Sequence, residues 1–164
     1  YQEAGEFDPN LQVALFGVAT MGLKINRNEE ALDAAESILE EDPENEDAIR
    51  IRYNAALALG QEDRIVDALL SIAPYEPAIA NQGLWLLAIA AYDASDMDRA
   101  KSRFGKLLQV NPNHAAAHYH LGLIYLGEGA HAEAKQHLER FVQLAPDDPE
   151  APSARDLIEY LSKS

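Results

Sequence analysis

The chain has 164 residues, enough for one domain of ordinary size, and its 28 acidic and 13 basic residues give a formal net charge of −15. Such a negative surface repels phosphate backbones and anionic lipids, which excludes nucleic acid and membrane surfaces as favoured partners and suits a basic or apolar protein segment. The chain contains no cysteine, which excludes disulfides and thiolate chemistry.

The sequence leaves the compartment open. It contains no run of about 18 apolar residues that could span a bilayer, and no basic leader followed by an apolar stretch and a cleavage site. Residue 1 is tyrosine rather than methionine, so we expect a processed protein or an excised fragment. A soluble protein is expected, either cytoplasmic or, if a signal peptide was removed, periplasmic or secreted.

Residues 1–9 have two open readings. Tyr1 to Phe7 imitates the end of a helix and its turn, as found again at Tyr125 to Gly129, which suggests the remnant of an earlier repeat. An irregular entry segment is the alternative.

Residues 10–45 predict two amphipathic helices joined by a turn. Asn28 is expected to cap the second helix, and Pro43 to end it. The apolar and small faces of the two helices are formed by Leu15, Val18, Ala19 and Gly22, and by Ala31, Ala35 and Ile38.

Residues 46–77 and 78–114 predict two further helical hairpins, of which the first is irregular. Ala31 to Ala68 spans 37 residues, Ala68 to Ala100 spans 32, and Ala100 to Ala134 spans 34. We interpret this as a local insertion nearly cancelled by a local deletion, as expected if the stacking beyond it must be kept. Gly105 inside a helix costs about 1 kcal/mol relative to alanine, which suggests a packing reason for it.

Residues 115–148 carry the clearest pattern. One helix face is formed by Leu121, Gly122 and Tyr125, and the answering face by Ala134, Leu138 and Phe141, before Pro146. A glycine or alanine is needed where two helix backbones approach within about 8–10 Å. This stretch resembles the tetratricopeptide (TPR) repeat, whose pattern is Trp-x2-Leu-Gly-x2-Tyr, then Ala-x3-Phe, then Pro over about 34 residues. His118 stands at the Trp position and Leu138 at the Phe position.

The resemblance implies an all-α fold, a right-handed superhelical solenoid of about four TPR helix-turn-helix repeats with a C-terminal capping helix. The TPR domain is expected over residues 10–148, and residues 149–164 are expected to cap it because the last repeat otherwise leaves its apolar side open to water. The repeats are expected at about residues 10–45, 46–77, 78–114 and 115–148.

In TPR proteins the first helices of successive repeats line a concave groove in which peptides lie, and the residue after the Trp-like position points into it. The resemblance therefore implies an aromatic groove residue in every repeat. Tyr53 and Tyr119 are open to a second interpretation, as packing residues between adjacent helices, whereas Trp85 is expected to face the groove. The implied groove residues are Phe16, Thr20, Tyr53, Leu57, Trp85, Ile89, Tyr92, Tyr119, Leu123 and Leu126.

No motif for a nucleophile, a metal cluster or a phosphate site occurs, so we expect neither an enzyme nor a cofactor. All five histidines fall between His114 and His137. His114 and His118 stand four residues apart and could share a zinc ion, but no third ligand is apparent, so no metal is expected. We hypothesise that the packing or surface charge of this repeat changes as its imidazoles titrate near pH 6.5.

The sequence thus predicts a non-catalytic scaffold or adaptor that binds a partner peptide or protein segment in its groove. The alternatives are a structural module that associates with itself through exposed repeat ends, and the TPR part of a larger multidomain protein. An apolar aromatic groove with acidic surroundings suits an apolar or basic partner segment.

Overall fold

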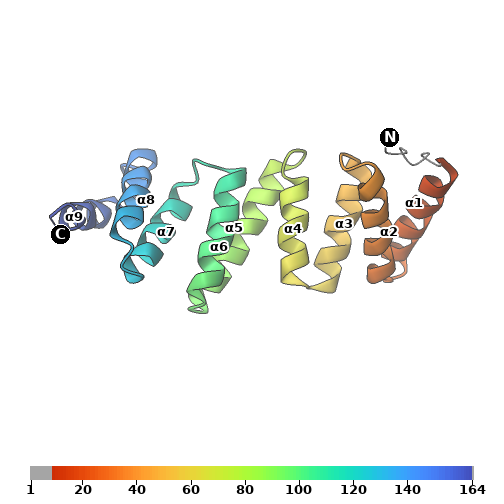
Figure 1. Cartoon of the computed structure of the whole chain (residues 1–164), viewed down its shortest axis with the longest axis horizontal. Helices are drawn as coiled ribbons and strands as arrows, with labels where there is room; N and C mark the ends of the chain where they lie inside the picture. The colour runs from red at the N-terminus through yellow and green to blue at the C-terminus, as the bar shows by residue number, and fades with distance from the viewer. Residues whose placement is uncertain (1–8, 164) are drawn as a thin grey trace, which may run out of the picture. The chain divides into compact units, whose positions relative to one another are not determined.

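The structure, a computed structural model, describes residues 9–163, so the segment that imitates the end of an earlier repeat lies outside the described residues. These described residues form α-helices joined by short turns and contain no strand, which confirms the all-α prediction (Figure 1). The helices are α1 (Pro9–Lys24), α2 (Asn28–Glu41), α3 (Glu46–Leu59), α4 (Glu62–Ile72), α5 (Pro77–Asp93), α6 (Met97–Val110), α7 (Ala115–Gly127), α8 (His131–Leu144) and α9 (Ala151–Leu161).

The chain divides into two compact units, one ending at Ile79 and the other beginning at Ala80, near the start of α5. In the first unit α1 packs on α2, α2 on α3 and α3 on α4. In the second unit α6 packs on α7, α7 on α8 and α8 on α9. Within each unit these helices pack against neighbours in sequence, as the repeat pattern predicts.

One turn residue in each hairpin adopts a left-handed backbone conformation. These residues are Asn26 and Ser95, both with φ of 60°, Gly60 with φ of 66° and Gly129 with φ of 75°. They follow one another at intervals of 34, 35 and 34 residues, and in every hairpin the second helix begins two residues later. The left-handed turn is therefore a direct structural marker of the repeat.

This marker corrects the predicted irregularity of the second repeat. Five residues after the left-handed turn the chain has Ala31, Ile65, Ala100 and Ala134, so Ala31 corresponds to Ile65 and not to Ala68. The buried residues Leu32, Ala34, Ala35 and Ile38 of α2 recur 34 residues later in α4 as Val66, Ala68, Leu69 and Ile72. The repeats therefore contain no compensating insertion and deletion. The unequal spacing arises because Ala68 lies three residues beyond Ile65, the position in α4 that corresponds to Ala31.

Two glycines mark the close approach of paired helices, as the sequence predicted. A Cβ atom on Gly122 of α7 would lie 2.7 Å from Cγ of Leu138 in α8. A Cβ atom on Gly22 of α1 would lie 3.0 Å from both the Ala31 Cβ and the Arg27 carbonyl oxygen. A side chain at Gly122 requires Leu138 to move, and one at Gly22 requires its neighbours to shift by a few tenths of an ångström.

Gly105 of α6 has no such reason, and the predicted packing role is wrong. A Cβ atom built there meets nothing within 4 Å. Its cost to the helix is therefore not offset by a close contact.

The helix caps also depart in one place from the prediction. Asn28 is the first residue of α2, and Arg27, at the cap position, makes no side-chain cap hydrogen bond. Side-chain caps are found instead at Asn45, Asp96 and His114, which accept hydrogen bonds from the backbone amides of Ala48, Arg99 and Ala117.

The last helix covers the preceding hairpin. Ala151, Ala154 and Leu161 of α9 form one buried cluster with Ala134, Leu138 and Phe141 of α8. The outward side of α9 carries the exposed residues Arg155, Asp156 and Glu159. This packing supports the proposal that α9 caps the repeats.

We predict that Gly105→Ala raises the free energy of unfolding by about 0.5–1 kcal/mol, because alanine is the better helix former and the site is open. Gly122→Ala is expected to lower it, because the new methyl group collides with Leu138. Urea denaturation followed by circular dichroism measures both changes. A loss of stability in Gly105→Ala would contradict the assignment of an open site.

Candidate functional site

The left-handed turn residues show which predicted groove residues are equivalent between hairpins. Phe16, Trp85 and Tyr119 each lie ten residues before the turn residue of their hairpin, but Tyr53 lies only seven residues before Gly60. Arg50 occupies the tenth position in the second hairpin. The predicted equivalence of Tyr53 with the other three aromatics is therefore wrong by three residues, for the same reason as the equivalence of Ala68.

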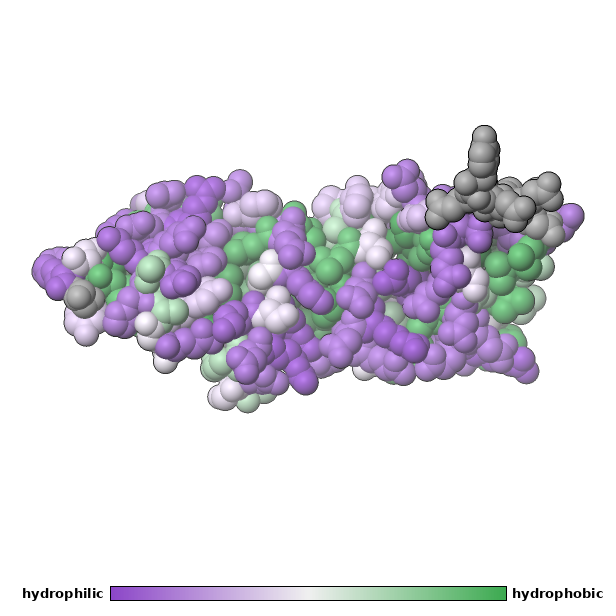
Figure 2. Space-filling view, viewed as in Figure 1, coloured by the Kyte–Doolittle hydropathy of each residue, from purple (hydrophilic) through white to green (hydrophobic). Residues whose placement is uncertain are grey.

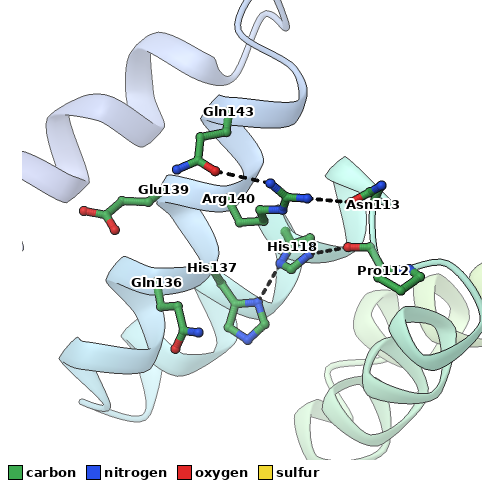
Figure 3. A pocket seen from close by; sticks show the side chains of 8 residues that line it. All are labelled: Pro112, Asn113, His118, Gln136, His137, Glu139, Arg140 and Gln143. Atoms are coloured by element: carbon green, nitrogen blue, oxygen red, sulfur yellow. Dashed lines mark hydrogen bonds between the residues drawn. The ribbon is translucent and has the colours of Figure 1, made fainter.

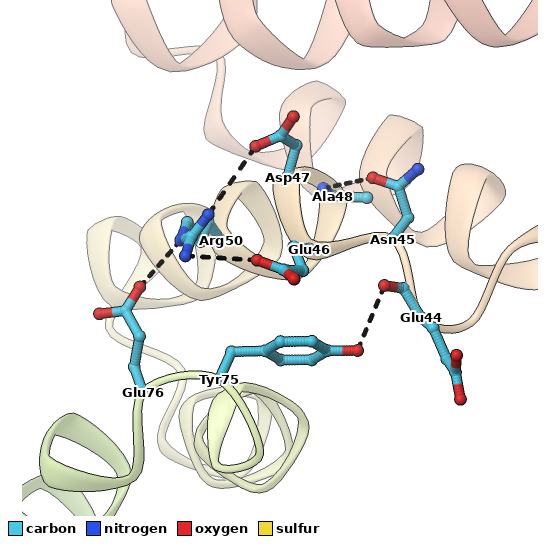
Figure 4. A network of polar contacts seen from close by, with 8 residues as sticks. All are labelled: Glu44, Asn45, Glu46, Asp47, Ala48, Arg50, Tyr75 and Glu76. Carbon is cyan, nitrogen blue, oxygen red and sulfur yellow. Dashed lines mark hydrogen bonds and ion pairs between the residues drawn. The ribbon is translucent and has the colours of Figure 1, made fainter.

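Arg50 is held by carboxylates rather than exposed as a free cation. Its Nε donates to Oε1 of Glu76 at 2.8 Å, and its terminal nitrogens lie 3.6 Å from Glu46 and 3.9 Å from Asp47 (Figure 4). The nearby Tyr75 hydroxyl donates to the Glu44 carbonyl oxygen at 3.2 Å. The position that carries an aromatic ring in the other hairpins is therefore occupied here by an arginine whose charge is already paired with carboxylates.

The other predicted groove residues of the first unit differ in exposure. Thr20 is exposed and Leu57 is 46% exposed, whereas Phe16 and Tyr53 are half-buried. Burial, with a smaller contribution from Glu76, raises the pKa of Tyr53. Tyr53 therefore has part of its ring inside the protein.

In the second unit, aromatic rings from three helices surround His120 of α7. Its imidazole stacks on Phe104 of α6, with ring centroids 5.2 Å apart and planes 3° apart. Tyr92 of α5 meets it edge-on at 4.7 Å, and Trp85 and Tyr119 each lie 5.7 Å from it. We call these five residues the His120 cluster. It brings together three of the predicted groove residues.

Trp85 is half-buried within this cluster. Its indole stacks on His114 at 4.9 Å with planes 26° apart, and lies 5.8 Å from the Phe104 ring. His114 is held in place because its Nδ1 caps α7 by accepting a hydrogen bond from the Ala117 amide at 3.2 Å. One side of the indole therefore packs on the protein, and the remainder is accessible.

Tyr119 is also half-buried. Its hydroxyl donates to Oε2 of Glu150 at 2.9 Å, and its ring lies 4.9 Å from Phe141. Burial first, and the Glu150 hydrogen bond second, raise the pKa of Tyr119 to about 12. Tyr119 thus combines a packing contact with an accessible edge. The remaining predicted groove residues of this unit, Ile89, Leu123 and Leu126, are half-buried as well.

The sequence did not single out His120 as the residue around which the aromatic rings gather. Its Nδ1 is buried without a hydrogen-bond partner. Burial lowers its pKa, an effect that Asp93 partly opposes, so the imidazole is neutral at pH 7. The available signal was its position next to Tyr119, with Trp85 and Tyr92 on the preceding first helix.

A second pair of histidines lies beside a pocket in the same unit. His118 Nδ1 and His137 Nδ1 are 2.9 Å apart, and His118 Nε2 lies 3.1 Å from the Pro112 carbonyl oxygen (Figure 3). Burial lowers the pKa of both imidazoles. Over residues 9–163, no group of three or more His, Asp or Glu side chains is placed to hold a metal ion.

Helical hairpins that share a left-handed turn at a regular interval and recurring buried positions define a helical repeat. Residues 86–149 match the family model of the tetratricopeptide repeat. This match includes residues 115–148, which carry the resemblance found in the sequence.

Individual proteins are similar to the chain at low identity. Human protein O-mannosyl-transferase TMTC1 is 23% identical over 150 residues, which are 90% of this chain and 17% of that protein. The chain thus spans less than a fifth of the length of this curated relative. Among solved structures, MamA is 16% identical with a TM-score of 0.43, covering 95% of this chain and 88% of its own. YrrB, a TPR protein with an unusual peptide-binding site, is 21% identical with a TM-score of 0.44, covering 88% of this chain and 74% of its own.

No helix among the described residues is long and apolar enough to cross a membrane.

The thermal stability of the chain is predicted to fall as the pH drops from 7.5 to 5.5. Burial lowers the pKa of His114, His118, His120 and His137 in the folded protein, so the unfolded chain binds more protons over this range, and protonation favours unfolding. The effect begins near pH 6.5, the ordinary histidine value, and grows below it, which refines the predicted titration near pH 6.5.

His120→Phe should reduce this pH dependence, because a phenyl ring can stack on Phe104 and takes up no proton. Differential scanning fluorimetry at several pH values measures the effect. His131→Gln is the control, because the His131 side chain is exposed. An equal melting temperature at both pH values in the parent chain would contradict the prediction.

Proposed function

We propose that the chain is a non-catalytic protein-interaction scaffold whose second unit binds a partner segment on the face formed by α5 and α7. The observation that carries this proposal is the His120 cluster, which gathers Trp85, Tyr92 and Tyr119 as half-buried rings. Aromatic side chains that are packed on one side and accessible on the other give a rigid apolar surface at little entropic cost.

The composition of this face supports an apolar anchor in the partner. Ile89 and Leu123 lie four residues beyond Trp85 and Tyr119 on the same helices, and Tyr92 and Leu126 follow three residues later. The net charge of −15 favours basic residues on either side of that anchor. The partner is therefore proposed to be a protein segment with apolar anchors and a basic flank.

The first unit contributes differently to the proposed surface. Arg50 replaces the aromatic residue, and it is paired with Glu46, Asp47 and Glu76. Phe16, Thr20, Tyr53 and Leu57 remain proposed contact residues there, but they offer fewer rings. The main binding energy is proposed to come from the second unit.

We predict that Trp85→Ala abolishes capture of partner proteins from a cell lysate. Because the indole also packs on Phe104 and His114, the variant is expected to lose about 2–3 kcal/mol of stability while remaining helical at room temperature. Circular dichroism and affinity capture measure the two effects separately.

Leu86→Ala is the matched control, because Leu86 is the next residue of α5 and is 58% exposed. Leu86→Ala should retain both the helical signal and the captured proteins. The α5–α7 face would be excluded if a folded Trp85→Ala captured the same proteins as the parent chain.

A second candidate function, self-association, is favoured by α1. Leu11, Val18 and Met21 are 57%, 48% and 56% exposed, and Ile25 just beyond the helix is 54% exposed. With the exposed Ala14 they recur at intervals of three and four residues, the spacing of a helix-pairing stripe. Figure 2 shows hydrophobic side chains over this helix. Val18 was predicted to face α2, but the inner face is taken by Ala19 and Gly22, which are buried.

We propose a second copy of the chain as the occupant of this stripe. Helix α1 contains no carboxylate, so two copies can meet there without the repulsion expected of a chain with a net charge of −15.

We predict that the molar mass measured by light scattering doubles as the protein is concentrated, and that Val18→Glu keeps it monomeric by placing a charge in the stripe. Lys24→Glu is the control, because it adds more negative charge to the same helix but lies outside the stripe. A constant monomer mass for the parent chain would exclude self-association through α1.

A further inference from the structure

The pocket beside His118 is lined by none of the residues proposed for partner contact. It has a volume of about 450 Å³, and its lining comes from the α6–α7 loop, from α7 and from α8. The lining residues are Pro112, Asn113, His118, Gln136, His137, Glu139, Arg140 and Gln143. The side chains that form it are almost all polar (Figure 3).

The cation in this pocket has only neutral partners. Arg140 donates to Oδ1 of Asn113 at 2.5 Å and to Oε1 of Gln143 at 3.3 Å. Among the ion pairs found within residues 9–163, none includes Arg140. A guanidinium has five N–H donors in a planar fork, so Arg140 retains donors for a further acceptor. In a chain with twice as many acids as bases, an arginine without a carboxylate partner is informative.

The acid that lines the pocket does not occupy this place. Figure 3 shows the Glu139 carboxylate directed away from the Arg140 guanidinium. Glu139 pairs instead with Lys135, one turn earlier on α8, at 3.9 Å. The positive charge of Arg140 is therefore not neutralised from within the pocket.

The histidine pair has a defined hydrogen-bond direction. The Pro112 carbonyl oxygen can only accept, so His118 Nε2 carries a proton, and in the neutral ring Nδ1 then accepts from His137 Nδ1. One proton can be taken up at His137 Nε2, which leaves this last hydrogen bond in place. The pair can therefore add a positive charge beside Arg140 while its geometry is kept.

We propose that this pocket binds a carboxylate of a partner protein, with the Arg140 guanidinium as its main contact and the His118–His137 pair as a nearby proton acceptor. The Asn113 and Gln143 amides hold the guanidinium in position for this contact. The proposal rests on the proposed interaction function and adds to it a second, oppositely charged contact. An acidic group of the partner would bind here, while its apolar and basic segment binds the α5–α7 face.

The test uses small probes and needs no partner protein. N-acetylglycine supplies the carboxylate, N-acetylglycinamide is its neutral counterpart, and inorganic phosphate is the competing anion. In NMR spectra of the whole chain, N-acetylglycine is expected to shift the Arg140 Nε–H and the His118 and His137 ring signals in a saturable way. N-acetylglycinamide is expected to shift none of them.

Arg140→Gln should weaken N-acetylglycine binding by about tenfold, the change expected for one charge-assisted hydrogen bond. Arg155→Gln is the matched control. It removes the same charge from the same unit, and Arg155 donates to the Pro146 carbonyl oxygen outside the pocket. Binding that weakens equally in both variants would reflect net charge alone and would overturn the proposal.

The affinity for N-acetylglycine should rise from pH 7.5 to 5.5, because a bound anion favours the protonated histidine pair. The charged and titratable groups around the pair are Arg140 and Glu139 of α8, Tyr125 of α7, which stacks on His137, and His114 before α7. His137→Gln should remove the rise and leave binding at pH 7.5 in place, because His137 carries the nitrogen that takes up the proton. A rise that persists in His137→Gln would overturn the role of the pair.

Tighter binding of phosphate than of N-acetylglycine would assign the pocket to a free anion and overturn the carboxylate proposal. The outcome is separable from the proposed interaction function. If Trp85→Ala loses the captured proteins but no probe shifts the Arg140 signal, the α5–α7 face is supported and the carboxylate pocket is excluded. If the probe binds but Trp85→Ala captures the same proteins as the parent, the carboxylate pocket is supported and the α5–α7 face is excluded.

Discussion

The structure depends on the close contact between the two helices of each hairpin. At Gly122 the backbone of α7 approaches Leu138 so closely that an added methyl group would force this side chain to move, and a Cβ atom on Gly22 would lie 3.0 Å from Ala31. The left-handed turn that follows each first helix makes this approach possible, because it reverses the chain within about two residues. The interval between these turns then fixes which residues face the neighbouring hairpin.

That interval also decides how the rings of the second unit are arranged. Trp85 and Tyr119 stand at the same distance before their turns, and both rings lie 5.7 Å from His120, which also contacts Phe104 of α6. Burial among Phe104, Tyr92 and Trp85 keeps this imidazole neutral and leaves its Nδ1 without a partner. The ring contacts that pack His120 against α5 and α6 therefore also favour its neutral form.

The sequence predicted the helices and the close approach at Gly122 because both depend on local periodicity and on residue size. It failed where similar residues recur out of register. Ala68 and Tyr53 each resemble a repeat position that they do not occupy, since alanine is common in these helices and an aromatic is found near every groove position. The conformation of Gly60 resolves the register, and only coordinates show it.

The candidate site was predictable only in part. The sequence grouped Trp85, Tyr92 and Tyr119, and the structure brings them together around His120. The sequence did not predict their ring contacts with His114 and His120, because ring contacts between helices depend on the angle at which the helices pack. The same limit applied to the outer stripe of α1, where Val18 and Ala19 are adjacent in sequence yet have opposite environments. A one-residue step turns a helix by about 100°, which exchanges the buried and exposed sides.

Helices α1 and α9 differ in the side that they turn outward. Helix α1 presents an apolar stripe, whereas α9 buries its apolar side in its own hairpin and turns Arg155, Asp156 and Glu159 outward. In the proposed self-association, contact through α1 uses the same patch on both copies, which is an isologous arrangement that closes at two subunits.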